Sequence, residues 1–168
     1  DAALAAAEKR VREMPDESGA YLYRGIVYFN RQDYGAAEGD FNQAIRFAPE
    51  SPAAYYDLAL TQHKTGRLKD AHKSYEAMIA RNPEFMQAWY NRGLIELAQK
   101  HEKDAIHSFQ ETLRLTPQTA DAKNALAVAY IRQKKYDKAW QALSEAADIN
   151  SANMNVLANQ FIFEACLK

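Results

Sequence analysis

Residues 33–49 read DYGAAEGDFNQAIRFAP, and residues 69–83 read KDAHKSYEAMIARNP. In each stretch an Ala is followed four residues later by an aromatic residue, three residues after that by a small or apolar residue, and then by a Pro. Spacings of four and three residues place these side chains on one face of an α-helix. The Pro ends the helix, because it cannot continue the hydrogen-bond pattern.

The two stretches belong to a repeat with a period of 34 residues. Proline recurs at this spacing at Pro15, Pro49, Pro83 and Pro117. When units are counted from residues 18, 52, 86 and 120, position 20 is always Ala, namely Ala37, Ala71, Ala105 and Ala139. Position 24 is large and apolar (Phe41, Tyr75, Phe109, Leu143), and position 8 is small (Gly25, Ala59, Gly93, Ala127). A fixed period without insertions predicts stacked helical hairpins.

The alternation of small and large residues has a packing reason. Two helices approach closely only where the side chains at the crossing are small, so position 8 of the first helix should face position 20 of the second. The large residue at position 24 then fills the space beside them. A tight turn near residues 64–67 should join the two helices of a hairpin.

These residues resemble the tetratricopeptide repeat family. Small residues at positions 8 and 27 (Ala44 and Ala146 at the latter), Ala at 20, an aromatic at 24 and Pro at 32 match its pattern over essentially the whole chain. The resemblance implies an all-α fold, a right-handed superhelical solenoid of antiparallel helix pairs. Met78 and Thr112 depart from the pattern at position 27, which predicts looser packing there, and Arg92 with Glu96 suggests a helix-surface pair.

The resemblance divides residues 1–168 into a single repeat domain. Its expected parts are a half repeat at 1–17, four repeats at 18–51, 52–85, 86–119 and 120–153, and a last helix at 154–168. That helix carries the apolar residues Leu157, Phe161, Ile162 and Phe163. Three explanations stay open for it: the chain is part of a longer array, the helix packs against a second copy, or it is an unusual cap.

In this family, positions on the first helix of each repeat face a concave groove. Candidate groove residues here are Leu22, Ile26, Phe29, Asn30, Tyr56, Leu60, His63, Gln87, Tyr90, Asn91, Leu94, Asn124, Val128 and Ile131. Contiguous apolar surface of this kind marks a partner site, and Tyr56 and Tyr90 are residue types that carry binding energy. The alternative interpretation is that these residues serve only the packing between neighbouring first helices.

Several function classes are disfavoured. Lys and Arg (21) balance Asp and Glu (22), so no basic field is available for nucleic acid. No segment is long and apolar enough to span a membrane. No metal-ligand spacing, phosphate-binding loop or nucleophile motif is present, and Cys166 stands alone, so we expect no metal, no cofactor and no enzyme. Acidic residues such as Glu38, Asp40, Glu76 and Glu111 should lie on solvated faces.

The family's clamp for acidic chaperone tails also does not fit. It requires Lys and Arg at defined first-helix positions, and only Asn91 matches it here. The sequence therefore predicts a non-enzymatic protein-interaction scaffold, of the chaperone or adaptor kind, that binds a peptide or amphipathic helix of a partner protein. The alternative is an assembly element that forms a homodimer through its apolar terminal helices. Cytoplasmic and periplasmic locations fit the sequence equally.

Overall fold

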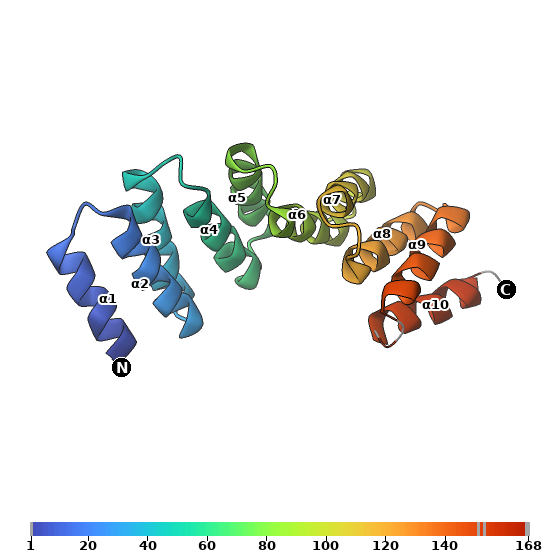
Figure 1. Ribbon diagram of the computed structural model, residues 1–168, viewed down its shortest axis with the longest axis horizontal. Coiled ribbons are helices and arrows are strands. Elements are labelled where there is room, and N and C mark those ends of the chain that lie inside the picture. Colours follow the sequence, from blue (N-terminus) through green and yellow to red (C-terminus); the bar gives the residue numbers. More distant parts are fainter. Residues whose placement is uncertain (1, 151, 153, 167–168) are drawn as a thin grey trace. The chain divides into compact units, whose positions relative to one another are not determined.

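The computed structural model describes residues 2–150, 152 and 154–166, and all regular structure in this part of the chain is helical (Figure 1). The helices are α1 (Ala2–Glu13), α2 (Ser18–Asn30), α3 (Tyr34–Phe47), α4 (Pro52–Lys64), α5 (Leu68–Arg81), α6 (Met86–Ala98), α7 (Glu102–Leu115), α8 (Ala120–Arg132), α9 (Tyr136–Ile149) and α10 (Met154–Cys166). The predicted all-α fold of paired helices is confirmed.

The chain divides into two compact units, Asp1–Pro83 and Glu84–Lys168. In the first unit α2 pairs with α3 and α4 with α5, while α1 packs on α2 and α3 on α4. In the second unit α6 pairs with α7 and α8 with α9, α7 packs on α8, and α10 packs on both α8 and α9. Each unit is therefore a short stack of helical hairpins in which every hairpin buries its apolar face against the next.

The cores of the first and third repeats show the predicted alternation of a small residue at position 8 with a large residue at position 24. Phe41 and Phe109 are fully buried. A Cβ atom built on Gly25 would lie 2.6 Å from Cε1 of Phe41, and one built on Gly93 would lie 2.6 Å from Cε1 of Phe109. Because that distance is shorter than a van der Waals contact, the ring occupies the space that a larger residue at position 8 would need.

The burial of the residues at position 27 differs from what the sequence predicted. Met78 and Thr112 are 2% and 0% exposed, so the structure does not show the looser packing predicted there. The hydroxyl of Thr112 donates a hydrogen bond of 2.9 Å to the carbonyl oxygen of Ser108. Thr is tolerated at this buried position because its polar atom finds a partner on its own helix.

A second correction concerns the pair formed by Arg92 and Glu96, in which Glu96 is buried and Arg92 largely so, instead of lying on the helix surface. Their side chains are only 13% and 3% exposed, with Nε of Arg92 3.1 Å from Oε1 of Glu96. The hydroxyl of Ser108, on α7, accepts hydrogen bonds from Nε and Nη2 of Arg92 (3.1 and 3.0 Å) and donates one of 2.6 Å to Oε2 of Glu96. The three side chains form a closed polar network between α6 and α7.

The equivalent positions of the first repeat hold another internal ion pair. Asp40, predicted on a solvated face, is 5% exposed. It accepts two hydrogen bonds of 2.7 Å from Nε and Nη2 of Arg24, and this bonding raises the pKa of Arg24. The pair joins α2 to α3 at the same repeat positions that Arg92 and Ser108 occupy. Of the other acidic residues, Glu38 and Glu111 are half-buried and Glu76 is exposed.

The turn inside each hairpin places one residue in the left-handed region of the backbone. Its φ is 63° at Gln32, 77° at Gly66, 63° at Lys100 and 59° at Lys134. The following amide donates to a carbonyl five residues back, as from His101 to Glu96 at 2.8 Å, which is the hydrogen bond of a Schellman motif. Glycine is favoured at this position, because a Cβ atom is crowded there.

Replacing Lys100 by Gly should therefore raise the free energy of unfolding by about 0.5–1 kcal/mol. Urea denaturation followed by circular dichroism measures the change. The matched control is Lys103→Gly, three residues later inside α7, which should lower stability by about 0.5–1 kcal/mol. Equal effects of the two substitutions would contradict the role assigned to the turn.

Candidate protein-binding surface

In the first unit, the candidate binding residues lie on α2 and α4. Leu22 and Phe29 are half-buried and pack against the cluster that contains Phe41 and Leu58. Ile26 is 38% exposed, and Asn30, at the end of α2, is also exposed. The face of α2 is thus divided between side chains that hold the hairpin together and side chains open to contact.

The residues on α4 have a more buried environment. Tyr56, Leu60 and His63 are half-buried. The Tyr56 ring lies 5.9 Å from the buried Tyr75 ring, so it rests on the hairpin interior. Burial, and then the charge of Lys64, lower the pKa of His63, which keeps the imidazole neutral near pH 7. We refer to Leu22, Ile26, Phe29, Asn30, Tyr56, Leu60 and His63 as the first-helix surface of unit 1.

In the second unit, the first-helix surface consists of Gln87, Tyr90, Asn91 and Leu94 on α6 with Asn124, Val128 and Ile131 on α8. Gln87 is exposed, and Asn91 is half-buried. Tyr90 is half-buried with its ring 6.0 Å from the Phe109 ring. Burial, and then the charge of Asp121, raise the pKa of Tyr90. Leu94, Val128 and Ile131 are partly buried against the core of this unit.

Asn124 occupies a different place from the rest of this surface. It is only 8% exposed, and its Oδ1 accepts a hydrogen bond of 2.9 Å from Nδ2 of Asn159 on α10. The last helix therefore covers Asn124, and a partner could reach this residue only after α10 moved. The sequence did not predict that α10 covers Asn124, because Asn124 and Asn159 are 35 positions apart.

The four residues proposed for self-association do not share one environment. Ile162 is 53% exposed, whereas Phe163 is 4% exposed and belongs to the core of unit 2. Leu157 is half-buried, and the side chain of Phe161 lies outside the described residues. Only Ile162 among the described members of this set presents a large apolar surface to solvent.

Two exposed aromatic side chains were not among the sequence candidates. Tyr23 is 42% exposed and lies one turn from Ile26 on α2. Trp140, on α9, is 46% exposed. The sequence does distinguish Trp140 from its repeat equivalents, because the same position holds Glu38, His72 and Ile106 in the other three repeats. Among the described residues, no group of His, Cys, Asp and Glu is arranged to hold a metal ion, and no helix could cross a membrane.

Asp57, next to Tyr56 on α4, has an unusual proton affinity. Burial raises the pKa of Asp57 from its ordinary value of 3.8 to about 6. Since the folded chain holds this proton more tightly than the unfolded chain, the free energy of unfolding should fall as the pH rises from about 3.8 to 6. Ionised Asp57 is thus a cost to the folded state at neutral pH.

The Asp57→Asn variant should be more stable than the wild type by about 1–2 kcal/mol at pH 7, after allowance for the part of the carboxylate that water still reaches. The stability difference between the two proteins should disappear as the pH falls below the ordinary pKa of 3.8, where the carboxyl becomes protonated in both states. Urea denaturation at a series of pH values measures both results. Asp16→Asn, at an exposed turn residue, is the control, and a flat difference between Asp57→Asn and wild type would contradict the prediction.

Stacked helical hairpins with a 34-residue period, whose first helices present apolar and aromatic side chains, define the class of helical-repeat proteins that serve as binding scaffolds. A model of the tetratricopeptide repeat family matches residues 1–52, 56–106 and 103–153. The chain belongs to the tetratricopeptide repeat family.

The relatives agree with this assignment. The chain is 29% identical to tetratricopeptide repeat protein 16 of Macaca fascicularis over 68 residues, which are 40% of this chain and 8% of the relative. The human protein of the same name is also 29% identical over 68 residues, 8% of its length. The match thus spans less than a tenth of the length of these curated relatives.

Solved structures show the same fold at low sequence identity. The crystal structure of MamA is 20% identical with a TM-score of 0.84, and the match covers 88% of this chain and 86% of MamA. YrrB, described as a TPR protein with an unusual peptide-binding site, is 24% identical with a TM-score of 0.84, and the match covers 94% of this chain and 81% of YrrB.

Proposed function

We propose that this chain is a non-enzymatic scaffold that binds a peptide or an amphipathic helix of a partner protein on its first-helix surfaces. The observation that carries the proposal is the exposure of apolar side chains on α2, where Ile26 is 38% and Tyr23 42% exposed. Large exposed apolar residues one helical turn apart favour contact with another apolar surface. The peptide-binding site of YrrB, a protein of the same fold, supports the proposal.

The chemistry of this surface indicates what a ligand should look like. Ile26 supplies the main apolar contact, the half-buried Leu22, Phe29 and Leu60 add the parts of their side chains that remain open, and Asn30 supplies an amide that can pair with a peptide backbone. An amphipathic helix or an extended apolar segment complements such a face. In unit 2, Tyr90, Leu94, Val128 and Ile131 offer the same kind of apolar contact together with the amides of Gln87 and Asn91.

A peptide display selection against the wild-type chain, followed by titration of the selected peptides, tests the proposal. Ile26→Glu places a charge on the exposed part of the surface and should weaken binding at least tenfold, while Tyr56→Ala or Tyr90→Ala should weaken it about fivefold or more. Asn42→Glu, on the exposed face of α3, is the matched control. If every selected peptide binds these variants as tightly as wild type, with helicity intact, the proposed surface is wrong.

The second candidate function is assembly through the terminal helices. Its support is the exposure of Ile162 on α10, 53%, and of Met14 just after α1, 49%. Sedimentation velocity should then show a homodimer that Ile162→Glu dissociates. A strict monomer at tens of micromolar that still captures peptides would exclude this candidate in favour of the first.

A further inference from the structure

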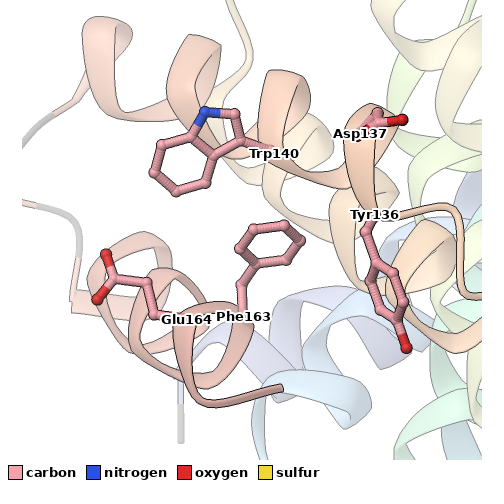
Figure 2. A pocket seen from close by; sticks show the side chains of 5 residues that line it. All are labelled: Tyr136, Asp137, Trp140, Phe163 and Glu164. Carbon is pink, nitrogen blue, oxygen red and sulfur yellow. The ribbon is translucent and has the colours of Figure 1, made fainter. Parts of the chain in front are cut away.

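A cavity of about 470 Å³ lies between α9 and α10, and none of its lining residues belongs to the first-helix surfaces. Tyr136, Asp137 and Trp140 line it from α9, while Phe163 and Glu164 line it from α10. Figure 2 shows the Phe163 ring between the Trp140 indole and the Tyr136 ring, with Asp137 and Glu164 toward opposite ends. The cavity is thus an aromatic hollow with acidic ends.

The aromatic side chains of the cavity contact one another. The Trp140 and Phe163 rings stack at 5.5 Å between centroids with an angle of 26° between their planes. Tyr136 meets Phe163 edge-on at 6.2 Å. Phe163 is 4% exposed and forms the floor, whereas Trp140 is 46% exposed and leaves much of its indole open to solvent. A flat, open indole is a favourable surface for a cationic group and for methylene chains.

The two carboxylates give the cavity a negative charge. Within the described part of the chain, neither Asp137 nor Glu164 has an ion pair or side-chain hydrogen bond, and no cationic residue lines the cavity. The nearby Lys138 extends over the Tyr130 ring instead, with Nζ 5.9 Å from its centroid. Two carboxylates that the described residues leave without counter-charges, beside exposed aromatic surface, complement a cation that carries an apolar stem.

The first unit shows what fills the corresponding place between its own hairpins. Glu38 holds the repeat position of Trp140, and Gln62 holds the repeat position of Glu164. There, the guanidinium of Arg67 from the next hairpin forms an ion pair with Glu38. The side-chain amide of Gln62 also donates to Glu38, at 3.4 Å. At this junction, Arg67, which follows the packed helix α4, therefore brings a cationic side chain to the place that corresponds to the cavity.

We propose that the cavity between α9 and α10 binds an Arg side chain presented by a helix of a partner protein. The methylene stem of the Arg packs on Trp140 and Phe163, and the guanidinium pairs with a carboxylate at the rim. Arg suits the site better than Lys, because its planar guanidinium stacks on an indole while it donates to a carboxylate. The site is separate from the first-helix surfaces and does not depend on their proposed role.

Two labelled peptides test the proposal by fluorescence anisotropy with the full chain. Both are Ala/Leu/Gln helices with blocked termini and no other charged residue, one with a single central Arg and the other with citrulline, its uncharged isostere, in the same place. The Arg peptide should bind about tenfold more tightly at low salt, and raising the salt should reduce that ratio. Asp137→Asn or Glu164→Gln should reduce the ratio about threefold or more, and Trp140→Ala should abolish binding of both peptides. Asp148→Asn, at an exposed carboxylate on the same helix, should change nothing.

The same measurements can overturn the proposal. Equal binding of the Arg and citrulline peptides, or no binding of the Arg peptide at millimolar concentration, contradicts it. Arg-peptide binding that Ile26→Glu abolishes and the charge variants leave intact would place the peptide on the first-helix surface instead. A dimer in sedimentation that Trp140→Ala dissolves would assign the cavity to a second copy. The two charge substitutions at exposed rim positions keep the test valid if Trp140→Ala loses helicity.

Discussion

Replacing Phe109 by Ala should lower the free energy of unfolding by about 3–5 kcal/mol. The ring is fully buried in the core of unit 2, and it packs directly on Gly93, where even a Cβ atom would come within 2.6 Å of it. A glycine cannot fill the space that the ring leaves, so the substitution should create a cavity. Urea denaturation monitored by circular dichroism measures the loss.

The chain supplies its own control for this prediction. In the fourth repeat the same two positions hold Ala127 and Leu143, both fully buried. The single substitution Gly93→Ala should destabilise the wild type, because the new methyl group meets the Phe109 ring. The double variant Gly93→Ala/Phe109→Leu should lose less than the sum of its two single substitutions, since Ala and Leu fit one another in the fourth repeat. A cost below about 1 kcal/mol for Phe109→Ala would contradict the assigned packing.

Replacing Glu96 by Ala should cost about 3–5 kcal/mol, because it leaves the buried guanidinium of Arg92 without its counter-charge. Glu96 is 2% exposed, and its two carboxylate oxygens contact Arg92 and Ser108 at 3.1 and 2.6 Å. Removing one member of this polar network leaves the other members buried without a partner, and each then costs its full desolvation penalty. Thermal and urea denaturation measure the loss, and Glu13→Ala, at an exposed residue, should change stability by less than about 0.5 kcal/mol.

The second repeat again provides the informative control. Its equivalent positions carry Leu58, Gln62 and Ser74, and the Ser74 hydroxyl donates a hydrogen bond of 2.8 Å to Oε1 of Gln62. The double variant Arg92→Leu/Glu96→Gln reproduces this uncharged set and should lie within about 1.5 kcal/mol of the wild type. If the double variant is as unstable as Glu96→Ala, the loss arises from altered packing and not from an unpaired buried charge.

Sequence comparison among the repeats predicted the core better than the surface. Phe41 and Phe109 lie where the pattern of small and large residues placed them, since volume complementarity between two helices of one hairpin is a local property. The burial of the candidate surface residues was harder to predict from the sequence. Ile26 is exposed, but Leu22 and Phe29 pack partly into the core, and only the angle between neighbouring helices decides how much of each side chain remains open.

The sequence by itself determined the 34-residue period, the helix pairs, the turns and the small and large residues of each core, because all of these depend on contacts within one hairpin. Only the tertiary structure decided that Asp40 and Glu96 are buried, that α10 covers Asn124, and that Tyr136, Trp140 and Phe163 enclose an acidic-ended cavity. The burial of a polar or aromatic side chain depends on which helix packs across from it. That neighbour comes from a distant part of the chain, and its distance and angle follow from the packing of all the side chains between the two helices.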